Sequence, residues 1–145
     1  MYDRILLPID GSNNAQLAAK RAIRTAERED AALHVLYVVE KSQDDPTQKG
    51  RDEHIAEQLN EGRDVVDEIV GQAKNEGVDT TSTVEDGVVR TMIEKYADEH
   101  EIDLITIGST GASGATEKLL GTVSKYVVNE APADVLVVRS DEQLS

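Results

Sequence analysis

The stretch IDLITIGSTGASGATEKLLGT, Ile102 to Thr122, joins a short apolar run to a loop with four glycines and then to a helical pattern. Continuous β-branched runs of this length are typical of parallel strands that are covered on both faces. Glycine adopts positive φ easily and lets a ligand approach the main-chain amides without a Cβ in the way. The first amides of a helix are unpaired and partly positive, so a strand, a glycine loop and a helix in this order favour an anion site.

The rest of the chain repeats the alternation of strand and helix. The other expected strands are apolar or, in the weakest case, rich in threonine: Arg4–Ile9, Leu33–Val39, Asp79–Val84 and Asp134–Arg139, beside Ile102–Ile107. Apolar residues recur at helical spacing in the segments between them: Asn14–Arg28, Arg51–Glu76, Val88–His100 and Glu117–Glu130. This order predicts one α/β domain over residues 1–145, an open five-stranded parallel sheet with helices on both faces. The polar segment Lys41–Gly50 is expected to be a surface loop.

The composition restricts the class of partner. The 145 residues include 29 acidic and 15 basic side chains, a formal net charge of −14, and no cysteine. Such a charge disfavours nucleic acids and anionic membranes as partners. It also suits a cytosol at molar salt, where charges are screened within about 3 Å, so a halophilic origin is expected. Neither a signal peptide nor an apolar run of about 18 residues is visible, which predicts a cytoplasmic protein without a membrane span.

The glycine loop lies in a part of the chain with little acidic charge. Residues 104–129 carry Lys118 and Lys125 against Glu117, whereas residues 40–101 hold 18 acidic and 7 basic residues. The loop lacks the Gly-Lys-Ser/Thr of a P-loop and does not have the GxGxxG spacing of dinucleotide-binding proteins. An anion would be bound by main-chain amides, with the hydroxyls of Thr122 and Ser124 as further donors. A plain turn at the first two glycines is the alternative.

The complete pattern G-x2-G-x9-G-[S/T], formed by Gly108, Gly111, Gly121 and Thr122, resembles the ATP-binding branch of the universal stress protein family. YDRILLPIDGS, from residue 2, resembles the first strand and turn of that family, and YVVEK, from residue 37, resembles the end of its second strand. The resemblance covers nearly the whole chain. It implies a Rossmann-like sheet with strand order 3-2-1-4-5.

The resemblance also implies a nucleotide site at the carboxyl ends of the strands. Asp10 would contact the ribose or the adenine, although an Asx turn with Gly11 and Ser12 is an alternative role for it. The main chain of Val38 would meet the adenine edge, and the four motif residues would hold the phosphates. The remaining residues of the expected site are Pro8, Ile9, Ser109, Gly114 and Val123, with Ser113 as a less certain donor. Mg²⁺ would accompany ATP through the phosphate oxygens and need few protein ligands.

Neither a catalytic residue nor a protein metal site is expected, so any ATP hydrolysis should be slow or depend on a partner. His34, His54 and His100 are scattered in the sequence and are expected to be structural. The last strand, Ala133–Arg139, would lie at the edge of the sheet, and the resemblance implies a homodimer through it. The predicted function is nucleotide-dependent stress response or signalling towards an unknown protein partner. The alternatives are a stress interaction protein that binds no nucleotide and an enzyme of adenylyl chemistry.

Overall fold

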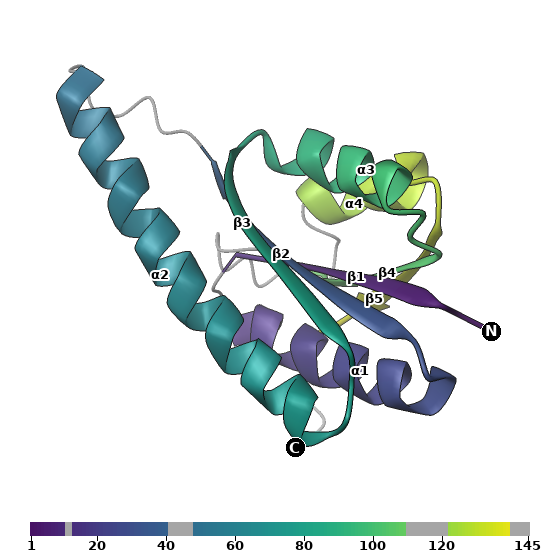
Figure 1. The fold of residues 1–145 in the computed structure, drawn as a ribbon. Coiled ribbons are helices and arrows are strands. Elements are labelled where there is room, and N and C mark those ends of the chain that lie inside the picture. Colours follow the sequence, from purple (N-terminus) through teal and green to yellow (C-terminus); the bar gives the residue numbers. More distant parts are fainter. Residues whose placement is uncertain (11–12, 41–47, 110–121, 140–145) are drawn as a thin grey trace.

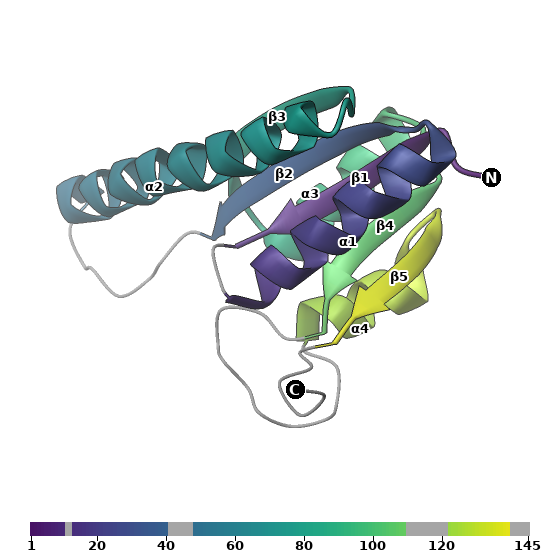
Figure 2. The same ribbon diagram turned by 90° about the horizontal axis from the view of Figure 1, so that it is seen from below.

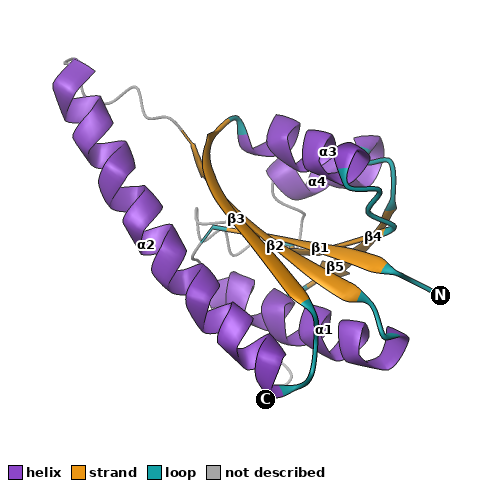
Figure 3. Ribbon diagram, in the orientation of Figure 1, coloured by secondary structure: helices purple, strands orange, loops and turns teal. Residues whose placement is uncertain are grey.

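The structure is a computed structural model that describes residues 1–10, 13–40, 48–109 and 122–139. Strands and helices alternate along these residues (Figure 1; Figure 3). The strands are β1 (Arg4–Ile9), β2 (Ala32–Glu40), β3 (Thr80–Gly87), β4 (Leu104–Gly108) and β5 (Asp134–Val138). The helices are α1 (Asn13–Glu29), α2 (Gln48–Asn75), α3 (Val89–Glu99) and α4 (Thr122–Glu130). All pairings are parallel and the sheet order is β3-β2-β1-β4-β5, which confirms the predicted fold.

Two layers of helices cover the sheet. α1 and α2 lie on one face and α3 and α4 on the other, as the two perpendicular views show (Figure 1; Figure 2). Successive side chains of a strand point to opposite faces. In β1, Ile5 and Leu7 therefore belong to the core beneath α1 and α2, whereas Leu6 belongs to the core beneath α3 and α4. The apolar runs of the sequence are continuous because each central strand has two buried faces.

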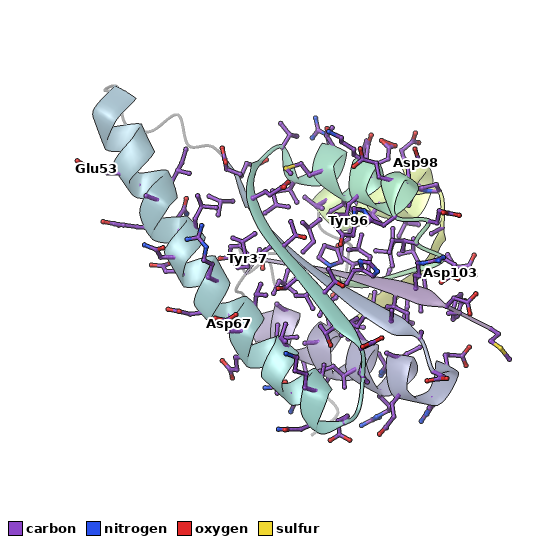
Figure 4. All side chains as sticks on the ribbon, viewed as in Figure 1. Tyr37, Glu53, Asp67, Tyr96, Asp98 and Asp103 are labelled. Carbon is purple, nitrogen blue, oxygen red and sulfur yellow. The ribbon has the colours of Figure 1, made fainter. Side chains whose placement is uncertain are left out.

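The face of α1 that meets the sheet is built from small residues. Alanines recur at helical spacing and are buried there: Ala15, Ala18, Ala19, Ala22 and Ala26. Small side chains allow a helix axis to approach a sheet closely, since little volume stands between the two backbones. By contrast, the acidic residues of the outer surface point away from the sheet, as Glu53 and Asp67 of α2 do in Figure 4.

Most described element boundaries lie within one residue of the sequence prediction, and α2, β3 and β4 show the larger differences; residues 117–121 of the expected fourth helix lie outside the described part of the chain. α2 begins at Gln48, so the last three residues of the expected loop 41–50 are helical, while residues 41–47 lie outside the described part of the chain. β3 continues past Val84 because β2 is long enough to pair with it as far as Glu40 and Gly87. β4 begins at Leu104, since the two residues before it belong to the turn that follows α3.

That turn is fixed by its own hydrogen bonds. The amide of Ile102 donates to the carbonyl of Ala97 at 2.9 Å, which closes the end of α3. The Asp103 carboxylate accepts hydrogen bonds from the amides of Asp3 and Arg4, both at 3.0 Å (Figure 4 labels Asp103). The Asp103 carboxylate thus holds the chain that enters β1.

A cluster of three rings lies between α3 and the sheet. His34 Nδ1 is 2.7 Å from the hydroxyl of Tyr96, and the His100 ring stacks on the Tyr96 ring with centroids 3.8 Å apart. The rings of His34 and His100 are 5.6 Å apart. Tyr96 and His100 are four positions apart, at helical spacing, whereas His34 comes from β2, 62 positions before Tyr96. Burial lowers the pKa of His34, and the neighbouring His100 and Arg4 lower it further.

The lowered pKa of His34 predicts a specific loss of stability in acid. A His whose folded pKa lies below its unfolded value, about 6.5, stabilises the fold fully above that pH, and the contribution is lost as the pH falls through the folded pKa. Urea unfolding between pH 8 and pH 5 should therefore show a smaller loss of stability for His34→Gln than for the wild type. His54→Gln, an exposed position on α2, is the control. Equal pH dependence in the wild type and His34→Gln would refute the prediction.

Candidate functional site

The two central strands separate at their carboxyl ends. β1 and β4 pair only at Ile5 with Leu104 and at Leu6 with Ile105. β1 continues to pair with β2 as far as Ile9, and β4 pairs with β5 as far as Gly108. The main-chain ladder between β1 and β4 thus stops three residues before β1 ends.

Pro8 gives a physical reason for this opening. The carbonyl of Asp3 accepts a hydrogen bond from the amide of Ala32, the first residue of β2. The carbonyl of Arg4 accepts one from the amide of Asp103, which directly precedes β4. Backbone groups of successive residues face alternate neighbours, so the even positions of β1 face β4. Pro8 is the next even position after Leu6 and has no N–H to donate. A proline is tolerated in this central strand because the ladder on that side ends there.

The helices that follow β1 and β4 leave on opposite faces. α1 packs on one face of the sheet and α4 on the other (Figure 2). This is the topological switch point of an open α/β sheet, where a crevice forms outside the carboxyl ends of the strands. The first turn of α4 begins at Thr122, so the amides that lack an intrahelical partner belong to the same end of the fold.

Two serines tie α4 and β5 to the end of β4. Ser124 Oγ donates a hydrogen bond of 2.6 Å to the carbonyl of Gly108, and the amide of Ser109 donates one of 2.9 Å to the carbonyl of Val138. Both serine side chains are buried. The hydroxyl of Ser124 therefore has a partner within the protein, and its role is to hold the start of α4 against β4 rather than to offer a free donor.

On the other side of the opening, the end of β1 is held by β2. The Tyr37 hydroxyl donates a 3.4 Å hydrogen bond to the main-chain carbonyl of Asp10, which is partly exposed. The side chains of Pro8 and Ile9 are buried. Val38 is also buried, in the core beneath α3 and α4, so only its main chain is placed to meet a ligand.

Most of the predicted site residues come together at this edge. The described ones fall on three segments: Pro8, Ile9 and Asp10 at the end of β1, Val38 on β2, and Gly108, Ser109, Thr122 and Val123 around the β4–α4 connection. Gly111, Gly114, Gly121 and Ser113 lie outside the described residues. The sequence analysis did not assign Tyr37 to the site. The signal available for it was its position directly before Val38, near the end of an expected strand.

Among the described site residues, Asp10 alone has a charged side chain, so an anionic group would meet main-chain donors at this edge. Among residues 1–10, 13–40, 48–109 and 122–139, no three His, Asp or Glu side chains are grouped so as to hold a metal ion. Across the same described segments, none of the helices combines the length and the apolar character that crossing a membrane requires. The chemistry that the edge supports is therefore the binding of an anionic group by amides and helix dipole.

Comparisons with known proteins place these features in context. The sequence profile of the universal stress protein family matches residues 1–139. A universal stress protein of Methanocaldococcus jannaschii is 34% identical over 148 residues, which cover 99% of this chain and 85% of the relative. The solved universal stress protein UspA of Lactobacillus plantarum superposes with a TM-score of 0.89 at 31% identity, covering 95% of this chain and 98% of that one.

A further solved structure shows a ligand. This universal stress protein, in complex with cAMP, superposes with a TM-score of 0.67 at 26% identity, covering 95% of this chain and 97% of that one. The similarities thus extend over the whole described fold and include a relative that binds an adenine nucleotide.

The Ser124 bond yields a prediction about stability. Ser124→Ala removes the donor to the part-buried Gly108 carbonyl, which should cost about 1 kcal/mol of unfolding free energy. Urea denaturation measures it. Lys125→Ala, at the exposed neighbouring position of α4, should change stability by less than about 0.5 kcal/mol. A Ser124→Ala variant as stable as the wild type would show that the bond contributes nothing.

Proposed function

Because this chain belongs to the universal stress protein family, we propose that it binds ATP in the opening between β1 and β4 and acts as a nucleotide-dependent stress-response or signalling module. The observation that carries the proposal is the early end of the β1–β4 ladder beside the first turn of α4. Ligands of open parallel sheets settle at such a point.

The proposed mode of binding uses the main chain. The phosphates lie on the amides of the glycine loop and of the first turn of α4, where Gly108, Gly111, Gly121 and Thr122 leave room for them. This mode suits a chain of net charge −14, because it needs no cluster of basic side chains. Mg²⁺ is carried by the phosphate oxygens.

The nucleoside lies on the β1–β2 side of the opening. The Asp10 carboxylate accepts hydrogen bonds from the ribose hydroxyls, and the main chain of Val38 meets the adenine edge. The relative that is solved with cAMP supports an adenine nucleotide as the class of ligand. The intact glycine pattern supports a triphosphate, since it supplies amides beyond those that a single phosphate needs.

Native mass spectrometry and calorimetry test the proposal directly. The purified protein is titrated with Mg-ATP, ADP, AMP and cAMP, and ATP should bind most tightly, one per subunit. A protein that binds none of the four would favour the alternative, a stress interaction protein without nucleotide.

A glycine variant tests the phosphate cradle. Gly121→Val should abolish detectable ATP binding in calorimetry while the fold is retained, because the added side chain takes the space of the phosphate. Gly71→Val is the matched control: a Cβ at Gly71, on α2, meets no atom within 4 Å. Normal ATP affinity of Gly121→Val would show that the loop does not hold the phosphates.

A homodimer through β5 is the second part of the proposal. β5 ends the described sheet, so one side of its main chain has no strand beside it there. The amide of Asp134 donates to Asp103 and the carbonyl of Val138 accepts from Ser109, so these positions face β4. The backbone groups of Val135 and Val137 consequently face outward. A second copy that pairs with this edge would satisfy them and cover a partly exposed apolar strand.

Proline at an outward-facing position tests the dimer. Val137→Pro removes an N–H that β4 does not use, so the subunit should fold while the dimer dissociates. Light scattering after size exclusion should give the mass of one chain for this variant. Val137→Thr, which keeps the N–H and the shape, should remain a dimer. If Val137→Pro still forms the dimer, the interface lies elsewhere.

A further inference from the structure

α2 approaches the sheet most closely at a glycine. A Cβ built on Gly62 would lie 2.5 Å from Cδ1 and 2.7 Å from Cε1 of the Tyr37 ring, distances that real Cβ atoms do not reach. A glycine inside a helix costs about 1 kcal/mol relative to alanine, so its presence in the middle of the 28-residue helix calls for a reason. The reason here is the flat Tyr37 ring, which occupies the space of the missing side chain.

The other end of Tyr37 reaches the candidate site. Tyr37 stands level with Ile9, the last residue of β1, and its hydroxyl donates to the carbonyl of Asp10. Figure 4 shows Tyr37 between α2 and the strands. Burial raises the pKa of Tyr37, and the carboxylates of Asp10 and Glu61 raise it further, so the hydroxyl keeps its proton and remains a donor.

One side chain thus contacts both α2, through its ring, and the end of β1, through its hydroxyl. The ring is positioned by the backbone of α2, and the hydroxyl holds the main chain of the residue that begins the β1–α1 connection. At 3.4 Å the hydrogen bond is long, so its geometry depends on where the ring is seated. A shift of α2 at Gly62 would move the ring and with it the donor to Asp10.

We propose that Tyr37 is a positioning residue that couples nucleotide binding at Asp10 to the seating of α2 at Gly62. The inference rests on the proposed nucleotide site. If Asp10 must be held to meet the ribose, part of the binding free energy depends on the Tyr37 hydroxyl. Coupling between two sites is reciprocal, so a bound nucleotide also restrains α2 around Gly62. A partner that binds α2 would then distinguish the nucleotide-bound protein from the free protein.

Three variants separate this role from a merely structural one. Tyr37→Phe keeps the ring and removes the hydroxyl, Gly62→Ala displaces the ring, and Gly71→Ala changes a glycine of the same helix that has no close neighbour. Each is studied by calorimetry with Mg-ATP and by amide hydrogen exchange of α2 with and without Mg-ATP. Urea unfolding is measured alongside, so that a loss of fold is not read as a loss of coupling.

The expected results are specific. In the wild type, Mg-ATP should slow exchange in the α2 peptide that contains Gly62. Tyr37→Phe should bind Mg-ATP roughly three- to tenfold more weakly, the effect of one neutral hydrogen bond, and should lose the protection of α2 on binding. Gly62→Ala should weaken binding at least as much, and Gly71→Ala should behave as the wild type.

The outcomes distinguish the two proposals. If the wild type binds no nucleotide, the proposed function fails and this coupling fails with it. If the wild type binds Mg-ATP but Tyr37→Phe binds with the same affinity and shows the same protection of α2, the function stands and the coupling is overturned. Tyr37→Phe retains the packed ring, so it decides the question even if Gly62→Ala does not fold.

Discussion

The end of the main-chain ladder between β1 and β4 is the constraint from which the candidate site follows. The pairing stops after Leu6 and Ile105, and Pro8, whose nitrogen faces β4, has no hydrogen to continue it. Strands that part at the centre of a sheet leave backbone groups which a ligand or water must satisfy. Among the described helices, α1 and α4 leave this edge on opposite faces of the sheet, the arrangement that forms a crevice in open α/β sheets.

Each side of the opening is held by hydrogen bonds to a neighbouring element. On the β4 side, Ser124 fixes the start of α4 to Gly108, and Ser109 fixes the end of β4 to β5. On the β1 side, Tyr37 holds Asp10. The described elements that bound the opening are therefore held in place by hydrogen bonds before any ligand arrives. Such preorganisation reduces the ordering cost of binding.

The strongly acidic composition is compatible with the proposed anion site, because the site would use main-chain amides and the acidic side chains of α2 and α3 lie on the outer surface. The acidic side chains of α2 and α3 point outward, as Glu53, Asp67 and Asp98 do in Figure 4. The donors at the edge of the sheet are amides, whose partial positive charge does not depend on the composition of the side chains. A chain of net charge −14 can accordingly offer an anion site without a basic patch.

The sequence alone determined the class of fold and indicated the edge of the sheet at which the candidate site was predicted. The hydrophobic periods of strands and helices are local properties of the sequence. Asp10 stands directly after β1 and Gly108 ends β4, and the carboxyl ends of parallel strands meet at one edge of the sheet. The ends of the elements were less predictable. β3 continues to Gly87 because β2 is long enough to pair with it, and the length of a pairing depends on both strands.

Only the tertiary structure decided the contacts between distant segments. The Tyr37 ring beside Gly62 and the contact between His34 and Tyr96 join residues whose spacing in the chain carries no signal. The local sequence around a helical glycine or a histidine in a strand does not show whether that residue contacts a ring or solvent. The neighbour that gives the residue its role comes from another element. Packing in three dimensions supplies that neighbour, and local sequence does not encode it.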